Sequence, residues 1–134
     1  MEFKDLINKR RSIRKFSDRP VPREVVDRLL AEALTAPSAR NTRTTRFLVV
    51  DNPELVVRMA DMRDYGSGFL KNAPLAIVVL GDTTAGDLWR ENASISATML
   101  QLACVDEGLG PCCVHIHGRP PRQARPEGAR AADY

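Results

Sequence analysis

The sequence lacks the features that define several large classes of protein. No apolar run reaches the roughly 18 residues that cross a bilayer, and the N-terminus is too charged for a signal peptide, so no membrane contact is expected. Its three cysteines form no Cys-x-x-Cys pair, which favours a reducing compartment and predicts a cytoplasmic protein. Aromatic residues make up only 5% of the chain, too few for base stacking, so no nucleic-acid partner is expected.

Basic residues are present, and they are unevenly spread. The chain has 134 residues, 43% of them hydrophobic, which predicts one domain over residues 1–134 with an ordinary core. Lys and Arg number 12 against 6 Asp and Glu over residues 1–46, but 4 against 9 over residues 47–114. The first third of the chain is therefore the part that attracts anions.

Hydrophobic periodicity predicts alternating helices and strands, an α/β or α+β pattern. Expected helices cover residues 2–9, 21–34, 53–62 and 87–106, and expected strands cover residues 46–50, 75–80 and 112–116. The strand at 75–80 is apolar on both faces, which predicts a central strand in a covered sheet. In the second helix the apolar stripe comprises Val25, Val26, Leu29, Leu30, Ala33 and Leu34. Gly108 is expected to end the long helix, and residues 118–134 to form a flexible loop or tail.

The stretch "RRSIRKF", residues 10–16, predicts an anion site. In an extended segment Arg10, Ser12 and Arg14 point to one side, and Arg11 and Ile13 to the other. Two guanidiniums beside a hydroxyl suit a phosphate monoester, because each planar fork donates two charge-assisted hydrogen bonds. The alternative is a basic turn that only faces water.

A second motif, "APSARNT" at residues 36–42, follows the first after one amphipathic helix. With this pairing the sequence resembles the nitroreductase family of flavin enzymes, whose signature is an "RRSxRxF"-like segment, a helix and an "APSxxN"-like loop. The resemblance extends to His117, through "NAP" before the apolar strand and "EGLGPCCV" after the long helix. It implies an α+β nitroreductase-like fold, with a central, mostly antiparallel β-sheet flanked by helices.

The resemblance also implies an FMN held at the interface of a homodimer. Arg10, Ser12 and Arg14 would meet the phosphate, and Arg11 the ribityl chain or ring. From the partner subunit, Pro37, Ser38 and Asn41 would line the isoalloxazine. The loop departs from the usual Gln-Pro-Trp continuation, so Arg40 or Arg43 could meet anionic groups of a nicotinamide cofactor or an acidic substrate. Ser38 and Asn41 could instead serve only as turn residues.

The stretch "CCVHIHG", residues 112–118, allows several interpretations of its cysteines and histidines. The resemblance places Val114 and His115 beside the pyrimidine edge of the flavin, where a protonated His115 could stabilise negative charge. Cys113, His115 and His117 would share one face of a strand and could hold zinc, but no fourth ligand is evident, so no metal is predicted. The vicinal cysteines are expected to be packing residues.

No candidate triad and no paired carboxylates occur, so the catalytic residues are unknown. This suits a flavin enzyme, because the cofactor carries the hydride. The resemblance implies a ping-pong cycle in which NADH or NADPH reduces FMN and a small acceptor, such as a nitroaromatic or quinone, takes the electrons. Alternatives are a dehalogenase-type flavin enzyme and an FMN-binding domain without turnover. The family usually continues with another strand and an arm, which this chain is expected to lack.

Overall fold

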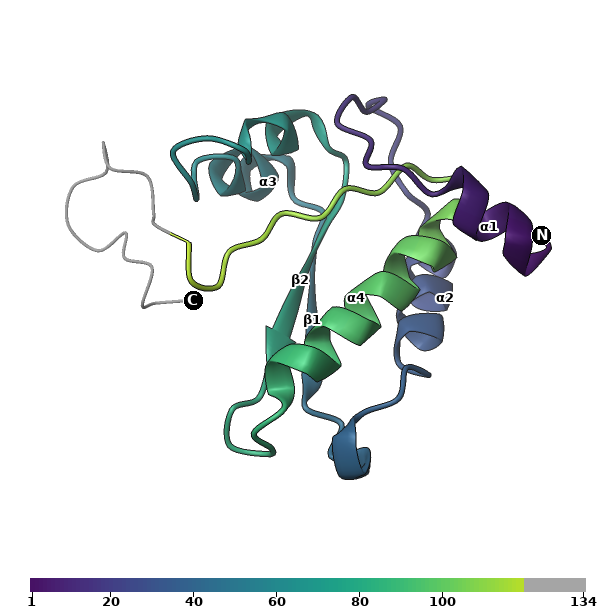
Figure 1. Cartoon of the computed structure of the whole chain (residues 1–134). Coiled ribbons are helices and arrows are strands. Elements are labelled where there is room, and N and C mark those ends of the chain that lie inside the picture. The colour runs from purple at the N-terminus through teal and green to yellow at the C-terminus, as the bar shows by residue number, and fades with distance from the viewer. Residues whose placement is uncertain (120–134) are drawn as a thin grey trace.

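The computed structural model describes residues 1–119, so the predicted tail lies almost wholly outside the described residues. Figure 1 shows the arrangement of the elements. No helix among residues 1–119 is long and apolar enough to span a membrane. In chain order the elements are α1 (Phe3–Lys9), α2 (Arg23–Ala33), the 3₁₀ turn η1 (Ala39–Asn41), β1 (Thr45–Val50), α3 (Pro53–Met59), the 3₁₀ turn η2 (Gly68–Asn72), β2 (Ala76–Gly81) and α4 (Trp89–Asp106).

Strands β1 and β2 form an antiparallel pair, in register from Thr45 opposite Gly81 to Val50 opposite Ala76. Because side chains alternate along a strand, Phe47 and Ile77 pack against the core cluster of α2 and α4, while Leu48 and Leu80 stay 53% and 46% exposed. Within residues 1–119, β2 has one neighbour and is not the fully covered central strand that its apolar sequence predicts.

The core lies between α2 and α4. Leu29 and Ala33 of α2 are fully buried against Leu100 and Ala103 of α4. The periodicity predicts this face of α2 correctly up to Ala33, where the helix ends. Leu34, assigned to the same stripe, is 58% exposed, because helix α2 ends at Ala33 and a turn begins at Leu34.

Helix α4 ends as predicted at Gly108. This residue has φ 79°, a left-handed conformation that costs glycine little, and its N–H donates to the carbonyl of Val105. The N–H of Leu109 donates to the carbonyl of Cys104, which completes the cap. One residue earlier, Glu107 accepts two hydrogen bonds from Arg28 of α2, at 2.6 and 2.9 Å. The end of α4 is thereby tied to α2.

The strand predicted at residues 112–116 is absent from the structure. A strand needs a neighbour along its whole length, and here the backbone bonds are isolated ones. The carbonyl of Pro111 accepts from the N–H of Ile13, and the carbonyl of His115 accepts from the guanidinium of Arg63. The argument that Cys113, His115 and His117 share a strand face therefore fails, and residues 1–119 contain no group of three side chains placed to hold a metal ion.

Candidate flavin site

The basic cluster, residues 10–14, runs from α1 across the C-terminal end of α4. It is held there by the hydrogen bond from the N–H of Ile13 to Pro111. Gly110 allows the close approach, because a Cβ at that position would lie 2.9 Å from Cγ1 of Ile13. Arg11 and Ile13 line the same shallow groove, of about 410 Å³, so these two side chains share a side as the alternation predicts.

The donors of the cluster suit an anion. Arg10 is half-buried, Ser12 and Arg14 are exposed, and within residues 1–119 no ion pair joins either arginine to a carboxylate. The Arg14 guanidinium lies 6.0 Å from the ring centroid of Phe69, which steadies it without using its hydrogen bonds. One guanidinium nitrogen of Arg11 donates hydrogen bonds to the carbonyls of Asn8 and Arg10, at 2.9 and 2.7 Å. Two guanidinium forks and a hydroxyl fit a phosphate dianion, and this donor set is the chemistry that FMN binding requires.

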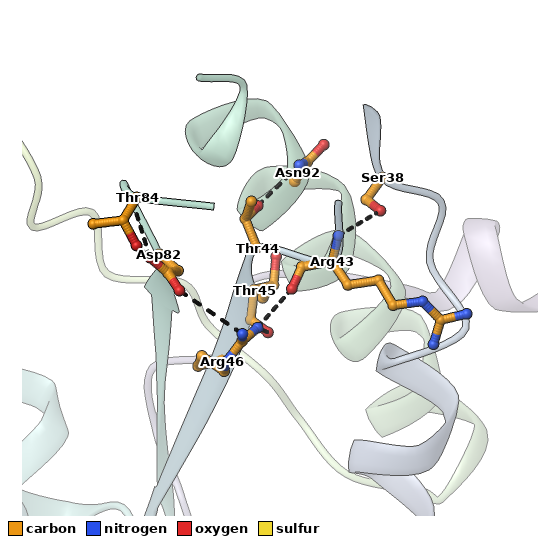
Figure 2. A network of polar contacts seen from close by, with 8 residues as sticks. All are labelled: Ser38, Arg43, Thr44, Thr45, Arg46, Asp82, Thr84 and Asn92. Carbon is orange, nitrogen blue, oxygen red and sulfur yellow. Dashed lines mark hydrogen bonds and ion pairs between the residues drawn. The ribbon is translucent and has the colours of Figure 1, made fainter. Parts of the chain in front are cut away.

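The second motif forms a tightly folded loop, residues 38–44, between α2 and β1. Arg40, Asn41 and Arg43 all have left-handed backbones, with φ of 54°, 56° and 50°. The Ser38 hydroxyl accepts from the N–H of Arg43 at 3.0 Å (Figure 2). Arg43 Nε donates to the side-chain oxygen of Asn41 at 3.1 Å. Ser38 is half-buried, whereas Pro37, Arg40 and Asn41 are exposed and available to a ligand.

Asn92, in the first turn of α4, anchors this loop. Its side-chain oxygen accepts from the N–H of Ala39 at 2.9 Å. Its side-chain nitrogen donates to the hydroxyl of Thr44 at 2.9 Å (Figure 2). Sequence reasoning missed Asn92, because a polar residue in an apolar helix is normally read as facing water. The available signal was its position on the buried row of α4 with Ser96 and Leu100.

The loop exit is attached to the turn after β2. Arg46 donates to the carbonyl of Arg43 at 2.6 Å and forms an ion pair with Asp82 at 3.8 Å. Asp82 also accepts from the hydroxyl and N–H of Thr84, and these bonds, aided by Arg46, lower the pKa of its carboxyl (Figure 2). The turn therefore holds a carboxylate rather than a carboxylic acid.

The two motifs lie at opposite ends of α4. The basic cluster meets the chain just after its C-terminus, and the loop meets its first turn, as Figure 1 shows. Because α4 has 18 residues and a helix rises 1.5 Å per residue, its ends lie about 27 Å apart. One mononucleotide cannot contact both motifs of the same chain.

The remaining candidates lie along the extended segment 112–117. Val114 is half-buried and the His115 side chain is exposed. The ring of His117 meets Trp89 edge-on, with ring centroids 5.1 Å apart.

The thiol of Cys104, in α4, is half-buried. Its burial, assisted by the charges of Glu107 and Glu32, raises the pKa of Cys104 to about 11, so that side chain stays protonated and unreactive at neutral pH.

Comparison with known proteins identifies relatives of this chain. The nitroreductase family model matches residues 7–63. Over 133 residues, covering 97% of this chain and 68% of the relative, the sequence is 35% identical to a "Putative NADH dehydrogenase/NAD(P)H nitroreductase" of Methanothermobacter thermautotrophicus. An FMN-dependent nitroreductase from Clostridium difficile R20291 superposes with a TM-score of 0.83 and 44% identity, over 85% of this chain and 66% of that one.

The chain belongs to the nitroreductase family, as the two motifs predict. The predicted α+β fold of that family is confirmed by the solved structure. The chain spans about two thirds of the length of the relatives it matches. A shorter stretch, 54 residues or 40% of this chain and 19% of the relative, is 48% identical to rat iodotyrosine deiodinase 1.

Proposed function

We propose that this chain carries the FMN site of a homodimeric NAD(P)H-dependent oxidoreductase. Membership of the nitroreductase family supports the class of enzyme. The observation that carries the proposal is the separation of the two motifs along α4, because only a second copy can bring a loop to the basic cluster of the first. Two apolar side chains suit contact with that copy because they stay exposed: Leu88, just before α4, at 42%, and Ile95, within α4, at 41%.

Each motif has a distinct part in this site. Arg10, Ser12 and Arg14 bind the phosphate, and the free part of the Arg11 fork reaches the ribityl chain. From the second copy, Pro37, Ser38, Arg40 and Asn41 lie against the ring. Val114 and His115 lie along the pyrimidine edge. Bound FMN supplies the hydride chemistry, with NADH or NADPH as donor and a nitroaromatic or quinone as acceptor, so ping-pong kinetics are expected.

The absorbance spectrum of the full chain tests the proposal. We expect the protein reconstituted with FMN to be yellow, to bind FMN saturably, and to bleach on anaerobic addition of NADH or NADPH. Arg14→Glu should raise the Kd for FMN by about ten- to hundredfold, the cost of lost charge-assisted bonds. Lys15→Glu makes the same charge change one residue along and is the control. Absence of saturable uptake, or equal effects of both variants, would contradict the proposal.

A dehalogenase-type activity is the second candidate, favoured by the stretch similar to iodotyrosine deiodinase 1. Halide release from an iodinated phenol by the reduced holoprotein distinguishes it from nitro or quinone reduction. A yellow protein that neither nicotinamide bleaches would instead be an FMN-binding domain without turnover.

A further inference from the structure

We propose that Asn92 is a positioning residue that holds the 38–44 loop in its ligand-binding shape. The inference rests on the proposed flavin site, because that site gives the loop its role. None of the sequence motifs includes Asn92, which lies about 50 residues beyond the loop in the chain. Figure 2 shows Asn92 on α4 beside Thr44 of the loop.

The backbone of the loop needs such an anchor. Arg40 and Arg43 have side chains that disfavour positive φ, and Asn41 tolerates it better. Three left-handed residues within four positions persist only where surrounding structure enforces them. The loop's own bonds, such as Ser38 to Arg43, close the turn but do not attach it to the rest of the protein.

Asn92 supplies the attachment on both sides of the strained residues. Its side-chain oxygen accepts a hydrogen bond from the N–H of Ala39, which precedes Arg40. Its side-chain nitrogen donates a hydrogen bond to the hydroxyl of Thr44, which follows Arg43. A weaker contact, at 3.4 Å, runs to Thr42. Asn92 is 3% exposed and Thr44 is fully buried, so water does not compete for these bonds. The site needs an acceptor and a donor on one short side chain, which an amide provides and an apolar residue does not.

The structure also offers a matched control. Ser96 lies one turn further along the same face of α4, is 5% exposed, and donates to the carbonyl of Ala33 instead of to the loop. Ser96→Ala and Asn92→Leu each remove buried hydrogen bonds from the same helix. Of the two, only Asn92→Leu removes the bonds that join Ala39 and Thr44 of the loop to α4.

Trypsin provides a readout that needs no flavin, because Arg40 and Arg43 are cleavage sites inside the loop. We expect Asn92→Leu to accelerate cleavage after these two residues by about tenfold relative to Ser96→Ala, and to raise the Kd for FMN by a similar factor. Thermal melts of both variants show whether they differ in overall stability. If Asn92→Leu does not fold, Thr44→Val, which removes one of the same bonds at nearly constant volume, replaces it with an expected effect of about threefold.

Equal cleavage of the loop in the Asn92 or Thr44 variant and in Ser96→Ala overturns the inference. If the unaltered protein takes up no FMN, the proposed function fails, but the cleavage rates still decide whether Asn92 holds the loop. Faster cleavage with unchanged FMN affinity also overturns it, because the loop would then be anchored for a purpose other than binding flavin.

Discussion

The ion pair between Arg28 of α2 and Glu107 attaches the C-terminal end of α4 to α2. Glu107 is largely covered, with 18% of its side chain exposed, and Arg28 holds it through two nitrogens. The hydrogen bond from Arg28, with its charge, lowers the pKa of Glu107. A carboxylate whose pKa is lower in the folded state stabilises the fold above the pKa of the unfolded chain, and that stabilisation disappears as the pH falls through the folded pKa.

Glu107→Gln should therefore lower the urea midpoint at neutral pH and have a shrinking effect below a pH of about 4. Urea denaturation at several pH values, followed by the fluorescence of Trp89, measures the difference. The control is Asp18→Asn, since Asp18 is an exposed carboxylate that forms no ion pair within residues 1–119. A difference that stays constant from neutral to acid pH would contradict the linkage.

Helix α2 shows how a single turn of helix decides which apolar residues enter the core. Leu29 is fully buried, whereas Leu34, five residues later, is 58% exposed. Leu29→Ala should cost about 2–5 kcal/mol of unfolding free energy, because it leaves a cavity against α4. Leu34→Ala should change the unfolding free energy by no more than about 0.5 kcal/mol. Urea titration of the two variants gives both values, and similar losses would show that α2 extends beyond Ala33.

The elements differ in how much of them sequence could predict. Helix α2 and the end of α4 follow from local signals, the spacing of Val26, Leu29 and Ala33 and the glycine at position 108. Residues 112–116 have an apolar, β-branched pattern but no neighbouring strand among residues 1–119, and a strand depends on its neighbour.

The polar residues buried in α4 show that local sequence signals also predict only part of the candidate site. The motifs at residues 10–14 and 36–42 are contiguous in sequence and could be recognised there. Asn92 and Ser96 are buried because they bond to the loop and to the last turn of α2, and these contacts join residues about 50 to 60 positions apart. Periodicity within α4 places both residues on its buried row, but it does not identify the partners that they bond.

In the proposed dimer the flavin site is a property of two chains. In a two-fold symmetric dimer each site combines the basic cluster of one copy with the loop of the other. An arginine-cluster variant and a loop variant therefore damage different halves of every site. A mixture of the two variants can then contain intact sites that neither variant forms alone.

We expect Arg10→Glu/Arg14→Glu and Arg40→Glu/Asn41→Ala each to abolish FMN uptake when pure. After unfolding and refolding as an equal mixture, half of the dimers should contain one of each chain. Each such dimer has one site with both halves intact and one with both halves damaged, so about a quarter of all sites should bind FMN. Equilibrium dialysis against FMN measures this fraction, and each variant refolded by itself gives the baseline. A mixture that binds no more than that baseline would place both motifs in the site of a single chain, against the separation of about 27 Å that α4 imposes.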